Sequence, residues 1–167
     1  TARHAIAGLL EHLPSITLFG AHSVNAYRRF EPDSFAPATV TWSRDNRSAA
    51  IRSLVEPDPA ATRIELRSGA SDANPYWLIA SALAAIIAGL EAKSEPPPLG
   101  GGNLYHKGVP LPKSLGVAVE LATRDDTITE ILGADSVHDF AALARSEWTE
   151  YTAQVTDWER DRYLVSS

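Results

Sequence analysis

The sequence predicts an α+β domain in which an antiparallel sheet is flanked by helices. Three short runs of alternating apolar and polar residues, at 39–44, 48–54 and 62–67, predict strands. Longer runs with apolar residues at helical spacing lie before and after them. The chain has 167 residues, of which 44% are apolar and 22% charged, so it is long enough for one domain with a hydrophobic core.

The first predicted element is a helix. Five apolar residues fall at helical spacing in this region: Ala5, Ile6, Leu9, Leu10 and Leu13. Pro14 is expected to end the helix, because proline lacks the amide hydrogen of a helix interior. Residues 22–37 are rich in charge and turn formers, and we expect a loop there with a short helical turn.

The three predicted strands follow this loop. In the first, Val40 and Trp42 share one face. The run 62–67 alternates most clearly, with Ile64 and Leu66 on one face and three charged residues on the other: Arg63, Glu65 and Arg67. The linkers between the strands are short, so we expect an antiparallel meander.

Helices and one long loop fill the second half. Asn74 is a favourable N-cap before Pro75, and the apolar run 76–90 predicts a buried core helix. A membrane span is the alternative, but the run is shorter than the roughly 20 residues that a bilayer requires. Residues 94–112 contain the adjacent prolines 96–98 and the adjacent glycines 100–102, which predict a long loop. We then expect three further helices, at 113–122, 127–132 and, with Ser136 as N-cap, 136–155.

Net charge and amino-acid composition limit the possible functions and cellular locations. A net charge of −6 disfavours nucleic-acid binding. There is no cysteine, which excludes disulfides and thiolate metal sites and fits a reducing, cytoplasmic location. No signal-peptide pattern opens the chain. The chain begins at Thr1 and contains no methionine, so we expect it to be a piece of a longer protein.

Arginine is concentrated in the strand region. Seven of the twelve arginines lie between positions 28 and 67, and this stretch contains no lysine: Arg28, Arg29, Arg44, Arg47, Arg52, Arg63 and Arg67. Guanidinium groups suit planar, bidentate recognition of carboxylates and phosphates. One interpretation is an Arg/Glu ladder on a solvated sheet face. The other is phosphoryl chemistry, in which positive groups stabilise charge on phosphate oxygens. A nucleic-acid-binding sheet is a third, less favoured by the acidic total.

Other site signals are weak. The five histidines do not show metal-ligand spacing. The glycine run 100–102 lacks the Lys-Ser/Thr of a phosphate-binding loop and does not connect a strand to a helix. No Ser-His-Asp arrangement can be argued from spacing.

Several runs, in matching order, resemble the glutamine synthetase family. Residues 25–30 (NAYRRF) resemble its N-S-Y-K-R-L segment, 46–52 (NRSAAIR) its N-R-[ST]-A-x-I-R run, 63–67 (RIELR) its R-I-E-x-R run and 73–76 its A-N-P-Y. Residues 36–37, 103–105 and 155–164 also resemble family features. The resemblance covers nearly the whole chain. It implies that the chain is the C-terminal part of one glutamine-synthetase catalytic domain, with a guanidino-kinase-like fold.

The resemblance also implies a reaction. ATP, with Mg²⁺ or Mn²⁺, phosphorylates the γ-carboxylate of glutamate, and ammonia or an organic amine then displaces phosphate. Arg29 would hold the glutamate carboxylate, and Arg67 would lie against the reacting carboxylate, so both are substrate-binding candidates. Arg47 would contact the transferring phosphoryl group; it and Arg67 are the catalytic candidates. Nucleotide phosphates would be bound by Arg47, Arg52 and Arg63, and Glu65 would ligate the metal. A ring-shaped homo-oligomer, a dodecamer, is also implied.

Three positions depart from the family pattern. Phe35 stands where ammonia-using members carry a flap glutamate, so the resemblance points towards a bulkier amine, as in the polyamine and ethanolamine branches. The lysine expected shortly before Arg63 is replaced by alanine. Tyr105 matches the tyrosine that is adenylylated in some members, but His106 follows it where aspartate is usual.

The family's β-grasp domain and its other metal ligands would precede Thr1. We therefore expect the isolated chain to have no ligase activity. A non-catalytic family member that uses the fold for binding or regulation is the alternative function. A phosphagen-kinase-like transferase is a third hypothesis, and the runs at 46–52 and 73–76 favour the synthetase side.

Overall fold

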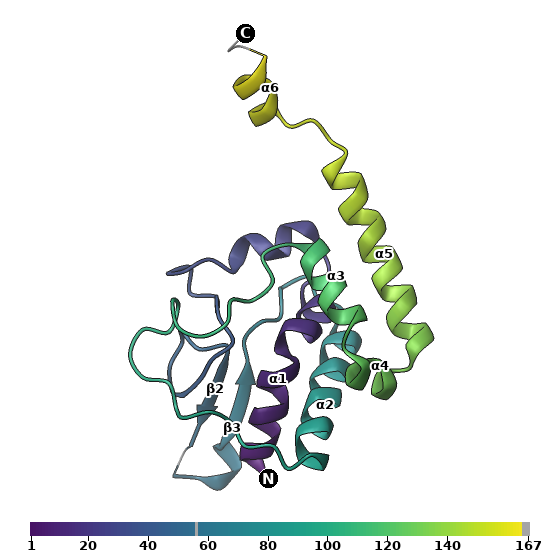
Figure 1. Ribbon diagram of the computed structural model, residues 1–167. Helices are drawn as coiled ribbons and strands as arrows, with labels where there is room; N and C mark the ends of the chain where they lie inside the picture. The colour runs from purple at the N-terminus through teal and green to yellow at the C-terminus, as the bar shows by residue number, and fades with distance from the viewer. Residues whose placement is uncertain (56, 165–167) are drawn as a thin grey trace.

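The computed structural model describes residues 1–55 and 57–164 (Figure 1). A three-stranded sheet lies against a long helix, and further helices pack on that helix's other side. The strands are β1 (Trp42–Arg44), β2 (Ile51–Leu54) and β3 (Arg63–Leu66). The α-helices are α1 (Ala2–Gly20), α2 (Pro75–Glu91), α3 (Leu115–Thr123), α4 (Asp126–Leu132), α5 (Ala134–Thr152) and α6 (Asp157–Tyr163), with 3₁₀ helices η1 (Val24–Arg29) and η2 (Pro59–Ala61). The predicted α+β fold, a small sheet with flanking helices, is confirmed.

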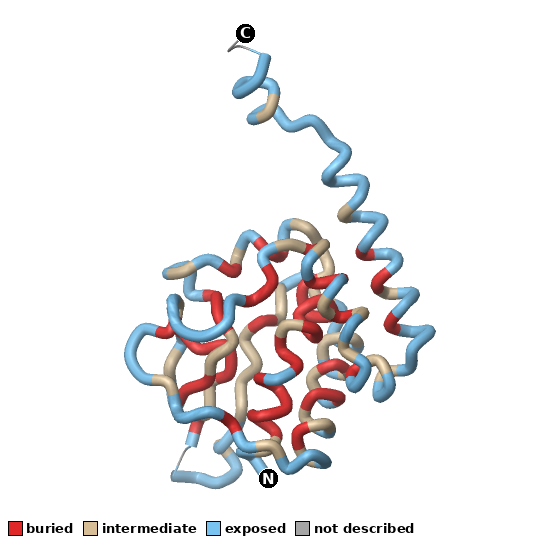
Figure 2. The backbone as a smooth tube through the Cα atoms, in the orientation of Figure 1, coloured by how far each residue is buried: buried red, intermediate tan, exposed pale blue. Residues whose placement is uncertain are grey.

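The central helix α1 does not end at Pro14, contrary to the sequence expectation. It continues to Gly20 with the proline inside it. Leu13, Leu18 and Phe19 have no exposed surface, and α1 is buried on almost every side between the sheet, α2 and α3 (Figure 2). Burial of this apolar surface outweighs the helical hydrogen bond that a proline removes.

The strand order is β1-β2-β3, and one detail of the expected meander is wrong. β2 and β3 are antiparallel, with Arg52 opposite Glu65, but β1 and β2 are parallel, with Trp42 opposite Ile51. The connecting residues 45–50 form a loop that folds back towards the start of β1. Its first residue, Asp45, has a left-handed backbone conformation (φ 44°). The chain therefore re-enters the sheet in its original direction.

The predicted long loop at 94–112 covers the β1 edge of the sheet. The indole of Trp42 donates a hydrogen bond to the Pro97 carbonyl (2.9 Å), and the hydroxyl of Ser43 donates to Gly100 (2.6 Å). Further along, the amide of Leu111 donates to the carbonyl of Ala38 (3.0 Å). The loop thus satisfies polar groups that an edge strand would leave open.

Helix α2 begins as predicted: the Asn74 side chain accepts a hydrogen bond from the Tyr76 amide, and Pro75 occupies the first turn. The expected core helix is buried on one face only, where Ala84 and Ala85 lie against α1. The opposite face exposes large apolar residues, including Leu83. Among the described residues, no helix is long and apolar enough to cross a membrane.

The C-terminal helices form an arm that extends from the body (Figures 1 and 2). Helix α5 begins at Ala134, after Gly133 in a left-handed conformation, rather than after Ser136. Helix α6 was not predicted from the sequence. Its signal was present, because Thr156 and Glu159 form a capping box, with each side chain accepting the other's backbone amide hydrogen.

Candidate functional site

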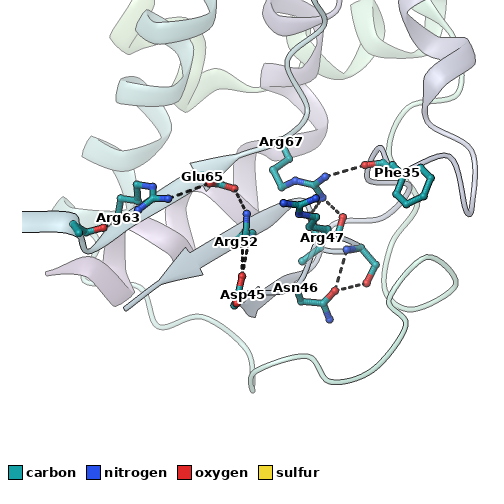
Figure 3. Close-up of polar contacts among 11 residues, drawn as sticks. Phe35, Asp45, Asn46, Arg47, Arg52, Arg63, Glu65 and Arg67 are labelled. Carbon is teal, nitrogen blue, oxygen red and sulfur yellow. Dashed lines mark hydrogen bonds and ion pairs between the residues drawn. The ribbon is translucent and has the colours of Figure 1, made fainter. Parts of the chain in front are cut away.

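Arginine and glutamate side chains converge on one face of the sheet, as the alternation predicts (Figure 3). Arg52 stands opposite Glu65 in the β2–β3 register, and the two are joined by a hydrogen bond of 3.0 Å. Arg63 lies on the other side of Glu65, at 3.8 Å. Arg52 also pairs with Asp45 at the end of β1. We call Arg47, Arg52, Arg63, Glu65 and Arg67 the arginine-rich face.

Glu65 is the residue predicted to ligate a metal. Its carboxylate is about one-third exposed and is held between two guanidinium groups. Within 1–55 and 57–164, the structure shows no cluster of three histidine or acidic side chains that could hold a metal ion. Divalent cations in proteins require several oxygen ligands. The described residues therefore do not make a metal site by themselves, and Glu65 contributes at most one ligand.

Arg47 projects from the 45–50 loop with an exposed side chain, and no ion pair to it is seen among the described residues. Asn46 fixes the shape of this loop. Its side-chain oxygen accepts from the Ser48 amide (2.9 Å), and its side-chain amide donates to Gly102 of the long loop (2.8 Å). The guanidinium group of Arg47 therefore has no ion partner among the described residues, and it projects from a loop that hydrogen bonds of Asn46 hold in place.

Arg67 ties two loops to β3. Its guanidinium donates to the carbonyl of Phe35 (2.8 Å) and to the carbonyls of Arg47 and Ala49 in the other loop. Burial lowers the pKa of Arg67 from its ordinary value. Sequence reasoning assigned this residue only to the reacting carboxylate, and the tether to Phe35 could be found only in three dimensions.

Arg29 lies at a second position, next to a cavity of 520 Å³ that is also lined by Asn25, Gly69 and Asp72. Its guanidinium donates to the Ser68 carbonyl (2.9 Å) and lies 5.3 Å from the centre of the Phe30 ring. Burial, together with the positive charge of Arg67, lowers the pKa of Arg29. Arg29 and Arg67 are thus close enough to interact, and neither forms an ion pair with a described carboxylate, although Asp72 partly offsets the effect on Arg29. Two such cations favour an anionic ligand.

A larger cavity of 770 Å³ opens beside Arg63 at the other end of the sheet. Its walls are mostly apolar and include Trp42, Ile64 and Leu99, while Arg44 also lines it. Sequence reasoning did not assign a ligand-binding role to Trp42 or Leu99. An apolar cavity with guanidinium groups suits a ligand that combines a flat apolar ring with negative charge.

The family model of the catalytic domain of glutamine synthetase matches residues 1–163. The chain belongs to the glutamine synthetase family. The resemblance drawn from the sequence runs is thereby confirmed.

Named relatives and solved structures agree with this assignment. The chain is 38% identical to a glutamine synthetase of Thermus thermophilus, over 99% of this chain and 39% of the relative. It is 37% identical to a gamma-glutamylethanolamide synthetase of Streptomyces coelicolor, over 96% of this chain and 34% of that protein. A solved GmaS/ADP complex matches with a TM-score of 0.86 and 31% identity, over 98% of this chain and 39% of that one. The chain thus spans well under half the length of these proteins.

Proposed function

We propose that this chain is the C-terminal part of the catalytic domain of an ATP-dependent ligase that forms a γ-glutamyl amide through γ-glutamyl phosphate. The observation that supports the proposal most directly is the arginine-rich face, where guanidinium groups from β2, β3 and the 45–50 loop gather on one side of the sheet. Among the described residues, the carboxylates paired with them are Glu65, held by Arg52 and Arg63, and Asp45, held by Arg52. Both steps of such a reaction concentrate negative charge, which fixed cations stabilise without reorganisation.

We assign each arginine a role according to its position in the site. Arg47, whose guanidinium has no ion partner among the described residues, would contact the transferring phosphoryl group. Arg52 and Arg63 would bind the nucleotide phosphates. Arg29 would bind the carboxylate of glutamate, and Arg67 would lie against the reacting carboxylate while holding the Phe35 loop in place. The family's divalent metal would supply further charge neutralisation, with Glu65 as one of its ligands and the others from outside the described residues.

The Phe35 side chain supports an organic amine as the acceptor. It is 80% exposed in a left-handed conformation (φ 63°), on a loop that Arg67 tethers to the arginine-rich face. A phenyl ring offers apolar area and a π face, which suit methylene groups and cations, but it cannot take a proton. The nearby carboxylate of Glu31 is 3.5 Å from Lys113 and is engaged there. We therefore propose that an alkylamine is preferred to ammonia.

Removing Arg47 should weaken nucleotide binding. Titration of the ¹⁵N-labelled chain with ATP, which carries the phosphoryl group assigned to Arg47, is expected to shift the amide signals of 45–52 and 63–67. The Arg47→Ala variant should raise the dissociation constant about tenfold, because it loses a charge-assisted hydrogen bond to phosphate. Its stability should not change, since Arg47 lacks an ion partner among the described residues.

Arg145→Ala, which removes an exposed arginine on α5, is the matched control and should bind ATP like the unaltered chain. Equal weakening by both variants would show that net charge, and not the arginine-rich face, attracts the nucleotide. A titration in which the signals of 45–52 do not move would contradict the assignment of Arg47.

The amine preference is tested in an enzyme that joins this chain to the rest of the catalytic domain. We expect a higher kcat/KM for putrescine, spermidine or ethanolamine than for ammonia at one pH. Phe35→Glu should improve the use of ammonia, because a carboxylate can bind ammonium and accept its proton. Phe35→Leu, which retains apolar area, is the control. If ammonia is the best substrate, and Phe35→Glu does not improve its use, Phe35 does not select the amine.

Two further proposals follow from family membership. The enzyme assembles into a ring-shaped homo-oligomer, and the isolated 167-residue chain lacks ligase activity because its metal ligands are incomplete. The non-catalytic alternative is not favoured, because every arginine expected at the site is present and those of the arginine-rich face converge on one side of the sheet.

A further inference from the structure

A further cavity, of 230 Å³ and with a polar lining, lies between η1, the start of α3 and the second half of α5. It is lined by Tyr27 and Arg28 from η1, by Lys113 and Ser114 before α3, and by Trp148 from α5. No residue of the arginine-rich face lines it. The volume is below that of typical cofactor sites and would hold a small molecule.

Tyr27 provides the observation that points to a ligand. The residue is 3% exposed, yet its hydroxyl has no hydrogen-bond partner among the residues described. A buried hydroxyl without a partner is unfavourable, and such groups in native proteins usually meet water or a ligand. Burial and the negative charge of Glu147 raise the pKa of Tyr27. The hydroxyl therefore stays protonated and can donate a hydrogen bond.

Other polar groups line the same cavity. Ser114 is the N-cap of the nine-residue helix α3 and accepts from the Val117 amide (3.3 Å), which leaves the first amides of the helix without an acceptor in the described part of the chain. The N-terminus of a helix carries partial positive charge. Arg28 is exposed and forms no ion pair with any described residue. The Trp148 indole packs on Gly116, where an added Cβ would lie 2.5 Å from the indole nitrogen.

Two acids limit what can bind. Glu31 lines the cavity and lies 3.5 Å from Lys113, whose ammonium group also donates to the Phe30 carbonyl (2.6 Å). The carboxylate of Glu147 accepts a hydrogen bond from the backbone amide of Val24 (2.8 Å). Both acids thus have partners, while no described residue accepts a hydrogen bond from the Tyr27 hydroxyl or forms an ion pair with the Arg28 guanidinium. We propose that this cavity binds a small oxyanion, the carboxylate or phosphate group of a metabolite, between these donors.

The test is a titration of the ¹⁵N-labelled chain with inorganic phosphate and, separately, with acetate. The indole N–H signal of Trp148, assigned with Trp148→Phe, reports on the two cavities that Trp148 lines and not on the arginine-rich face. Because one of these cavities is lined by Arg145 and not by Tyr27, the effect of Tyr27→Phe shows which of them binds the ion. We expect a saturable shift of this signal with at least one ion. Tyr27→Phe should raise the dissociation constant about tenfold, because a hydrogen bond to a charged group is lost. Glu31→Gln should lower it, because Lys113 is released.

The control is Tyr163→Phe, which removes an exposed hydroxyl on the distant helix α6 and should leave the dissociation constant unchanged. Saturation by acetate alone identifies a carboxylate ligand, and saturation by phosphate alone a phosphate. The proposal is overturned if neither ion shifts the Trp148 signal, or if Tyr27→Phe binds as tightly as the unaltered chain. Loss of thermal stability in Tyr27→Phe would also overturn it, because the hydroxyl would then have a partner within the protein.

Discussion

Replacing Gly8 by alanine is expected to lower the free energy of unfolding by about 3 kcal/mol or more. Helices α1 and α2 cross at Gly8 and Gly89 with their backbones in contact. A Cβ on Gly8 would lie 2.0 Å from the carbonyl oxygen of Ala85 and 2.7 Å from the amide nitrogen of Gly89. Both atoms belong to the backbone of α2 on the face that packs against α1, so the helices must separate to accept the methyl group. Urea denaturation followed by circular dichroism measures the change.

Gly101→Ala is the matched control for this substitution. Gly101 lies in the long loop, and a Cβ there meets nothing within 4 Å, so its stability should change by less than about 0.5 kcal/mol. The contact assigned to Gly8 is wrong if both alanine variants unfold at the same urea concentration as the unaltered chain.

Replacing Asp125 by alanine should destabilise the chain by about 3 kcal/mol near pH 5.5. Asp125 joins helices α1 and α4 through three contacts. Its carboxylate is 2.8 Å from Nδ1 of His12 on α1, accepts the hydroxyl of Ser15, and caps α4 through the Ile128 amide (3.1 Å). The side chains of His12 and Asp125 are only 10% and 14% exposed. The substitution leaves a buried imidazolium without its partner and removes the cap.

The effect should depend on pH. The hydrogen bond to Asp125 raises the pKa of His12 above its ordinary 6.5, although burial opposes it. Burial would raise the pKa of Asp125, but hydrogen bonds from His12, Ser15 and Ile128 outweigh it and lower the pKa. The contribution of His12 is present below pH 6.5 and is lost as pH rises through its raised pKa. That of Asp125 is present above its ordinary 3.8 and is lost as pH falls through its lowered pKa.

The stability difference between the unaltered chain and Asp125→Ala should therefore be larger at pH 5.5 than at pH 9, as measured by urea denaturation at both values. Asp139→Ala, which removes an exposed acid on α5, should show a small difference that does not change with pH. A difference for Asp125→Ala that is equal at the two pH values would show that His12 is not coupled to this carboxylate.

Local patterns determined much of this protein. Alternation at 62–67 placed Arg63, Glu65 and Arg67 on one face, because successive side chains of a strand point in opposite directions. Asn74 and Pro75 marked the start of α2 through groups only one or two residues away. The order of several runs indicated the family, which the comparison then confirmed. The capping box before α6 was equally local and could have been found from the sequence.

Contacts between distant segments decided the rest. Pro14 lies inside α1 because the sheet and α2 bury that helix, a gain that no nearby residue indicates. β1 is parallel to β2 because the 45–50 loop folds back onto the long glycine-containing loop through Asn46. Arg67 holds Phe35, 32 residues away, and Asp125 binds His12, 113 residues away. Sequence patterns specify which face a side chain occupies, but only the packed chain specifies which groups meet, because those contacts depend on chain segments far apart in the sequence.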